Sequence, residues 1–355
     1  MNEDRLKKLI RQLVAIEPNE RPLISCFLDL TPPRNDFAME IEPKARMIAK
    51  RLVGQPKSDF EDAMNEVREY VDRSLEDVAK GLAIYSRWGD EPTFIPVQFE
   101  VPLKSMLVVD DLPHIYPLIE LKDTYHRFVI VITTEGEARI LETTVGAVTE
   151  EVFAARPDLR ERVGREWTRT HYQNHKKERD QQFVREKIQI IEDLVSRRGH
   201  NHIVIAGSPK MVSRLTAALP SRLRSMLIDT IPTNPKGGVS PILLESIQLF
   251  AAAENLESHT NVELLESAAM TGGLGVVGYE SCRHALENGY ADMLILDQNE
   301  VELEMREELV RLATNAGIDI ETVNRSEALA RLSGVGCLLR YRPDFGPSAL
   351  GTLAA

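Results

Sequence analysis

The sequence has few cysteines, few aromatic residues and no long uninterrupted apolar run. Its three cysteines, Cys26, Cys282 and Cys337, lie far apart, with neither a metal-binding spacing nor the even number of a disulfide framework. No apolar stretch approaches the roughly 20 residues that cross a bilayer. The first 18 residues place apolar and charged side chains at helical spacing, unlike the apolar core of a signal peptide. These absences predict a cytoplasmic protein without a membrane span.

Charge is distributed unevenly along the chain. The 355 residues carry 43 Lys and Arg against 55 Asp and Glu, a net charge of −12 that argues against wholesale coating of nucleic acid. Residues 156–224 differ, because sixteen Lys and Arg there face eight Asp and Glu, which leaves 27 against 47 elsewhere. A basic middle segment in an acidic protein fits either a solvated helix face or a contact with RNA.

Alternation of strand and helix patterns predicts an α/β protein. A Pro- and Gly-rich stretch, residues 232–238, is the clearest linker in the chain. We therefore expect three domains: a mixed α/β N-terminal domain (1–113), an α/β middle domain with a basic loop and a long helix (114–233), and a C-terminal α/β domain (234–355).

Apolar periodicity predicts the main elements of these domains. Strands are expected at 24–30, 94–99, 105–111, 292–297, 318–323 and 334–341, with a β-hairpin at 127–146 and a buried strand over HIVIAG. Helices are expected at the N-terminus and at 38–54, 59–88, 241–270, 280–288 and 303–316, with a long charged helix ending near 198. Gly207-Ser208-Pro209 is interpreted as a plain strand-to-helix turn, with Pro209 at the first helical position.

Residues 273–278, GLGVVG, match the glycine fingerprint of dinucleotide-binding loops. That fingerprint requires a buried strand directly before its first glycine. The preceding residues instead have apolar side chains at helical spacing, so no cofactor is predicted. A nucleotide-dependent enzyme remains an alternative, in which Gly275→Ala would abolish nucleotide binding.

A different resemblance begins at the same glycines. Residues 278–296, GYESCRHALENGYADMLIL, are similar to the C-terminal domain of the archaeal and eukaryotic peptide-chain release factor family, which includes Pelota. The shared positions are Gly278, Ala285, Leu286, Glu287, Gly289, Ala291, Leu294 and Ile295. Upstream, a hairpin, a polar loop, a long basic helix containing QQFVREK (181–187) and an apolar strand follow the order of the family's middle domain. The resemblance implies a three-domain protein whose C-terminal domain is an α/β/α sandwich of the release-factor type.

The sequence also departs from that family. The loop that should carry Gly-Gly-Gln reads Gly164-Arg165-Glu166-Trp167, without the hydrolytic glutamine, and the first segment lacks the Asn-Ile-Lys-Ser codon motif. Within the family the chain looks most like the bacterial branch with Balon-type ribosome hibernation factors. That resemblance implies a non-catalytic, stress-related translation factor that occupies the ribosomal A site, with elongation factor Tu and tRNA as possible further partners. The alternative is a rescue or release factor that hydrolyses peptidyl-tRNA with Glu166 or His171.

The resemblance places contact with ribosomal RNA on the basic loop, residues 160–170, and on the helix after it. The candidate residues are Arg160, Arg162, Arg165, Trp167, Arg169, His171, His175, Lys176 and Lys177. Cations there would neutralise phosphates, and Trp167 would either stack on a base or anchor the loop to its own domain. His171 and His175 have a metal-binding spacing, but the neighbouring lysines would repel a cation, so no metal site is predicted.

Overall fold

The computed structural model of the chain describes residues 3–31, 37–155, 169–198, 200–233 and 239–341. By their contacts they form two compact units, which we call the central unit (Met1–Glu3 and Tyr125–Ala253) and the terminal unit (Asp4–Thr124 and Glu254–Ala355). Helix α8, Ser240–Met270, is continuous across the boundary. No helix in the described ranges combines the length and apolarity needed to cross a membrane. The fold class is α/β, as predicted.

The central unit contains a five-stranded sheet with the order β7-β6-β5-β8-β9. Strands β5, β8 and β9 are parallel, and β6 and β7 continue from β5 as an antiparallel meander. The bounds are Phe128–Thr133 for β5, Glu137–Thr144 for β6, Ala147–Ala155 for β7, His202–Gly207 for β8 and Leu227–Pro232 for β9. Strands β5 and β8 are buried over nearly their whole length, which explains their continuous apolar runs.

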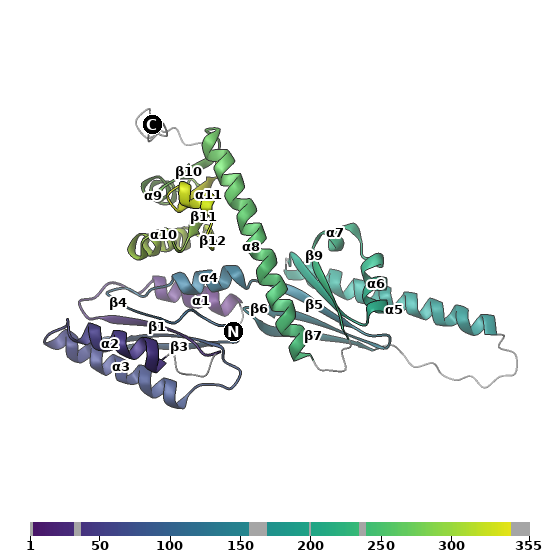
Figure 1. Cartoon of the computed structure of the whole chain (residues 1–355), viewed down its shortest axis with the longest axis horizontal. Helices are drawn as coiled ribbons and strands as arrows, with labels where there is room; N and C mark the ends of the chain where they lie inside the picture. The colour runs from purple at the N-terminus through teal and green to yellow at the C-terminus, as the bar shows by residue number, and fades with distance from the viewer. Residues whose placement is uncertain (1–2, 32–36, 156–168, 199, 234–238, 342–355) are drawn as a thin grey trace. The chain divides into compact units, whose positions relative to one another are not determined.

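Helices cover both faces of this sheet (Figure 1). On one face lie α5 (Arg169–Arg198), α6 (Pro209–Ala218) and α7 (Ser221–Ser225), and on the other lies the first half of α8. Successive side chains of a strand point to opposite faces, so Val129 and Val131 pack with α5 and α6, and Phe128 packs with α8. Each face therefore has its own hydrophobic core.

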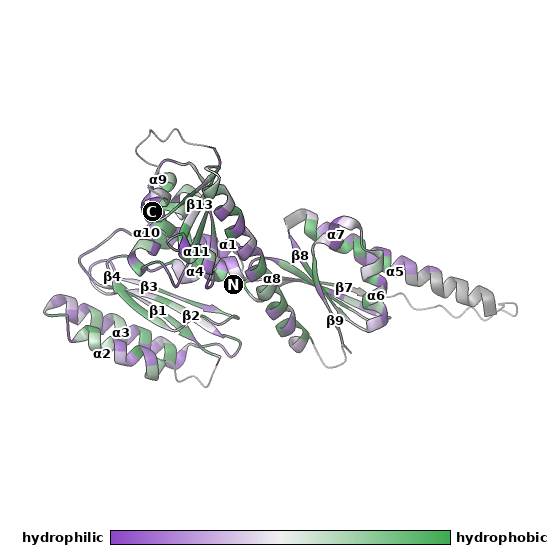
Figure 2. Ribbon diagram, turned by 45° about the horizontal axis from the view of Figure 1, so that its top comes forward, coloured by the Kyte–Doolittle hydropathy of each residue, from purple (hydrophilic) through white to green (hydrophobic). Residues whose placement is uncertain are grey.

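The terminal unit contains two four-stranded sheets. The sheet near the N-terminus is antiparallel, with the order β3-β2-β1-β4. Its strands are β1 (Leu23–Asp29), β2 (Gly81–Arg87), β3 (Thr93–Phe99) and β4 (Met106–Asp110). Residues of η1 (Phe37–Ile41), α2 (Glu42–Ala49) and α3 (Gln55–Arg73) bury one face of it. Figure 2 shows α2 and α3 as mixed purple and green ribbons, as expected of helices with one buried side.

The second sheet of the terminal unit has the order β10-β13-β11-β12. Its strands are β10 (Gly275–Val277), β11 (Ala291–Asp297), β12 (Asp319–Val323) and β13 (Val335–Leu339). The second half of α8 and α11 (Glu327–Arg331) pack on the face that carries Ile295. Helix α9 (Tyr279–Glu287) packs on β13 and against α10 (Leu303–Ala316). This arrangement is the predicted C-terminal sandwich.

Helix α4, Tyr116–Thr124, packs on the side of the second sheet, since it contacts both α10 and β12. Just before it, the buried His114 lies edge-on to Phe27 of β1, and its carbonyl accepts a hydrogen bond from Tyr85 of β2. Helix α1, Glu3–Val14, buries Leu6, Leu9, Ile10 and Leu13. Each of the three predicted domains thus contains one sheet. The domain boundaries at 113 and 233 stay a prediction.

Some elements were predicted with the wrong bounds, and others were not predicted. The helix expected at 59–88 ends at Arg73, and its last residues form the buried strand β2. A strand buried on both faces gives a continuous apolar run that periodicity does not distinguish from a helix. The helix expected at 38–54 is the short η1 followed by α2. Strands β7 and β9 and helix α4 were not predicted.

Candidate functional site

The structure places only part of the predicted RNA-binding set. Arg160, Arg162, Arg165 and Trp167 lie outside the described residues. The remaining five, Arg169, His171, His175, Lys176 and Lys177, belong to the first turns of helix α5. The predicted long helix after the basic loop is confirmed, whereas the predicted contacts of these side chains stay predictions.

The second half of α5 is held against the sheet of the central unit. Phe183, Val184 and Ile191 are buried there. Lys187 is also fully buried, and its Nζ donates to Thr133 Oγ1 at 2.6 Å and lies 3.9 Å from the ring centroid of Phe183. One of the sixteen cations of the basic segment is therefore part of the interior and does not face solvent.

A buried polar pair follows α5. His200 Nε2 lies 2.9 Å from Glu142 Oε1, and both side chains are almost fully shielded from solvent. Glu142 belongs to β6 and His200 to the short connection that leads into β8. A buried pair of this kind is costly to break, because removing one partner leaves the other without compensation. We assign these two residues to the stability of the central unit.

The glycine motif at 273–278 has a structural role. Helix α8, not a strand, precedes it, and Gly275–Val277 form β10, which pairs antiparallel with β13. A Cβ on Gly275 would lie 2.9 Å from that of Ala268, so the glycine lets β10 pass close to α8. Asp297 is buried and accepts from the backbone N–H groups of Asn299 and Ser326. The dinucleotide interpretation therefore has no structural basis in the part of the chain that the structure describes.

The terminal unit holds three carboxylates close together around α8 and β12. Asp123 Oδ2 accepts from the backbone N–H and the hydroxyl of Thr322, at 2.6 and 2.7 Å. Glu321 accepts from Ser258 and Asn261 of α8. Burial, and then Glu321, raise the pKa of Asp123 to about 7. Burial also raises the pKa of Glu254 to about 8, with contributions from Glu257, Asp123 and Glu321.

These raised pKa values predict a loss of stability with rising pH. The folded state keeps protons on Asp123 and Glu254 that the unfolded chain releases near pH 4, so the stabilisation present below pH 4 disappears towards pH 7 to 8. Asp123→Asn should flatten this decline by roughly 1–3 kcal/mol, since one pKa unit corresponds to about 1.4 kcal/mol. Urea unfolding of the wild type and the variant between pH 4 and 8 measures this change in the free energy of unfolding. Asn at the exposed position Asp72 is the control, and an equal slope in both variants would contradict the prediction.

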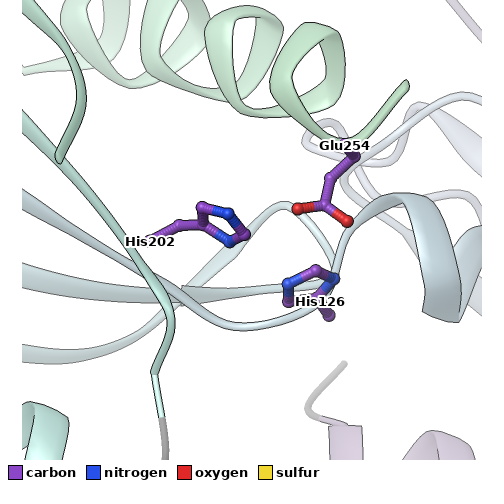
Figure 3. A group of neighbouring side chains, drawn as sticks. All are labelled: His126, His202 and Glu254. Atoms are coloured by element: carbon purple, nitrogen blue, oxygen red, sulfur yellow. The ribbon is translucent and has the colours of Figure 1, made fainter. Parts of the chain in front are cut away.

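Two imidazoles meet at the amino ends of parallel strands in the central unit. His126 precedes β5 by two residues, and His202 is the first residue of β8. Their ring centroids are 5.6 Å apart, and both lie edge-on to Phe250 of α8, at 5.0 and 5.5 Å. Figure 3 shows the two imidazole rings. The sequence analysis missed this group, because its members are separated by tens of residues and form no motif.

Comparison with known proteins supports the resemblance seen in the sequence. Residues 113–245 match the model of the bacterial archaeo-eukaryotic release factor family 10. No curated protein matches the sequence. The predicted resemblance to release factors and Pelota is thus confirmed over this segment, which includes the basic segment and all the predicted RNA-binding residues.

Solved structures of Pelota and Dom34 proteins are similar to this chain in fold. A ribosome-bound archaeal Pelota, described in a model with ABCE1, is 14% identical, with 96% of this chain and 94% of that chain covered and a TM-score of 0.46. Pelota from Archaeoglobus fulgidus is 13% identical over 96% and 92%, with a TM-score of 0.40. Dom34 of S. cerevisiae, described as a translation termination-like factor interacting with Hbs1, is 14% identical over 74% and 81%, with a TM-score of 0.42. At such identities and TM-scores, the likeness says nothing about function.

Proposed function

We propose that this protein is a ribosome-binding translation factor that occupies the A site and reaches towards the peptidyl-transferase centre without catalysing a reaction. The observation that carries the proposal is the release-factor family match over residues 113–245, because the most basic part of the chain lies inside it. Fifteen cations besides the interior Lys187, against eight acidic residues in 156–224, suit a surface of phosphates. The acidic remainder disfavours contacts with RNA elsewhere.

The absence of a hydrolytic glutamine in residues 161–170 supports occupancy instead of peptide release. A protein that fills the A site without cleaving peptidyl-tRNA blocks translation, which is the action of a hibernation factor during stress. Elongation factor Tu and tRNA are the further partners we propose, in the cytoplasm. Arg160, Arg162, Arg165, Trp167 and the cations of the first turns of α5 would contact ribosomal RNA.

Ribosome binding should depend on the basic loop. We expect the protein to co-sediment with 70S ribosomes at low salt, and the triple variant Arg162→Ala, Arg165→Ala and Arg169→Ala to bind at least about tenfold more weakly. Each lost phosphate contact also lowers the slope of log K against log salt by about 0.7 to 0.9, so the triple variant should lose about two units of slope. Sedimentation over a range of salt concentrations measures both quantities.

A matched control removes three cations from the terminal unit. Lys57, Arg73 and Arg331 are exposed and form only surface ion pairs. Their replacement by Ala changes the net charge equally and should leave ribosome affinity within about twofold, since surface pairs contribute little. Equal losses in both triple variants would show that net charge, not the basic loop, governs binding. Hydrolysis of peptidyl-tRNA by the wild type, lost in Glu166→Gln, would favour the release-factor alternative.

A further inference from the structure

A small cavity lies beside helix α1 in the terminal unit. Its volume is about 240 Å³, and all the residues that line it belong to this unit. They come from α1, from α4, and from the segment between Thr314 and Ile320 that ends α10 and begins β12. Segments from the two ends of the described chain therefore meet around one space.

The floor of this cavity is apolar. It consists of Ile10 of α1, Ile119 of α4 and, at the start of β12, Ile318 and Ile320. None of these four side chains is more than 8% exposed, so the floor is packed in place without a ligand. An apolar lining with a few polar groups around it is typical of sites for small molecules.

Three cations line the same cavity. Lys7 and Arg11 stand four residues apart on α1, so they share one face of that helix. Lys122 of α4 is held at the start of β12, because the neighbouring Asp123 Oδ2 accepts from the N–H and the hydroxyl of Thr322 at 2.6 and 2.7 Å. Within the described residues, no ion pair involves Arg11 or Lys122. The charges of these two side chains are therefore available to a ligand.

Helix capping does not account for the three cations. At the end of α10, the carbonyl groups of Ala313 and Thr314 accept from the backbone N–H groups of Ile318 and Gly317, at 2.9 and 3.2 Å. Gly317 has a φ of +66°, the left-handed conformation that is common after the last turn of a helix. These carbonyl groups therefore have partners without help from a side chain.

Two further polar groups line the cavity. The hydroxyl of Thr314 is buried and has no hydrogen-bond partner among the described residues, which is a costly state for a hydroxyl. A ligand oxygen at this point would supply a partner. Asp319 is the one acidic residue in the described lining, so three positive charges surround the cavity against one negative charge. This balance favours an anion with more than one charge.

We propose that this cavity binds a phosphomonoester, which joins a dianionic phosphate to a small apolar or aromatic body. The phosphate would contact Lys7, Arg11 and Lys122, because hydrogen bonds between charged groups are stronger than neutral ones. The apolar body would lie on the isoleucine floor, where its contact with water is lost. The cavity is smaller than the roughly 300–1,000 Å³ of pockets for drug-sized ligands, so the ligand is a small molecule. This site is distinct from the basic loop and does not depend on the proposed function.

Calorimetric titration of the full-length protein with phenyl phosphate tests this site. At pH 8 and low salt, the wild type should bind one equivalent with a Kd below about 1 mM, and at least about threefold more tightly than inorganic phosphate. Arg11→Gln and Lys122→Gln should each weaken binding by at least about fivefold, since each removes a charge-assisted contact. Asp319→Asn should strengthen binding, because it removes the negative charge that repels an anion, whereas it would weaken binding of a cation.

A neighbouring lysine provides the matched control. Lys8 follows Lys7 on α1 and is exposed, but it does not line the cavity. Lys8→Gln changes the net charge as Arg11→Gln does and should leave the Kd within about twofold. Circular dichroism verifies folding, and phenyl phosphate should raise the unfolding midpoint of the wild type more than that of Arg11→Gln. The proposal is overturned by a lack of saturable binding up to about 10 mM, by equal affinity for phenyl phosphate and inorganic phosphate, by equal losses in Lys8→Gln and Arg11→Gln, or by weaker binding in Asp319→Asn.

Discussion

Replacing Gly207 with alanine is expected to unfold the central unit. Gly207 is the last residue of β8 and has a φ of +135°, a backbone conformation that residues other than glycine rarely adopt. A Cβ there would lie 1.9 Å from the carbonyl oxygen of Thr133 and 2.9 Å from its nitrogen. Thr133 is the register partner of Gly207 in the β5–β8 pair, so neither backbone can move without opening the sheet. The free energy of unfolding should fall by more than about 4 kcal/mol.

Hydrogen exchange followed by mass spectrometry can locate this effect. Peptides covering β5 and β8 should lose protection in Gly207→Ala. Gly136→Ala is the matched control, since it lies in the turn between β5 and β6 and a Cβ there meets nothing within 4 Å. That substitution should change stability by less than about 1 kcal/mol, with stabilisation as the favoured sign. Retained protection in Gly207→Ala would refute the described strand ending.

Replacing Glu307 with alanine should separate the two sheets of the terminal unit. Glu307 of α10 lies 2.6 Å from His114 Nδ1 and accepts from the backbone N–H groups of Ile115 and Tyr116, at 2.6 and 3.2 Å. It therefore caps the amino end of α4, where backbone donors have no partner within the helix. Its removal leaves a buried histidine and two backbone donors unsatisfied. The expected loss is about 3–5 kcal/mol, as for a broken buried pair.

The neighbouring residue provides the control. Glu308 lies on the same helix, but its partners Arg283 and Tyr279 are at the surface. Glu308→Ala should cost less than about 1 kcal/mol. Urea unfolding of both variants, together with exchange rates of α4 amides, measures the difference. Similar costs in the two variants would show that Glu307 does not fasten α4, and Glu307→Gln should fall between wild type and alanine because it keeps an acceptor oxygen.

These two predictions concern contacts that no sequence pattern indicated. Glu307 is one of several glutamates on an amphipathic helix, and nothing in its neighbourhood separates it from Glu308. Its role depends on His114, Ile115 and Tyr116, which lie almost 200 residues earlier. The pair of His126 and His202 is similar, because the register of β5 and β8 creates it and not spacing along the chain.

Local pattern was sufficient for much of the fold. The runs FVIVIT and HIVIAG are strands because they are short, apolar and β-branched, and Pro209 begins a helix where expected. Gly289 follows α9, which ends close to the predicted bound, and has a φ of +70°, a left-handed conformation that favours glycine after a helix; Ala285 of α9 is fully buried. The resemblance to release factors also came from such local strings, and the family match over 113–245 confirms it for the middle segment, whereas the string at 278–296 lies outside the matched residues.

The sequence by itself determined the α/β class, the long helix after the basic loop and the helix before the glycine motif, because each depends on neighbours in the chain. Only the tertiary structure decided that residues 81–87 form a central strand, that Lys187 is interior, and which distant side chains meet. The physical reason is that periodicity reports which side of an element is buried but not what covers it. Burial on both faces, register and helix capping arise only when segments far apart in sequence pack together.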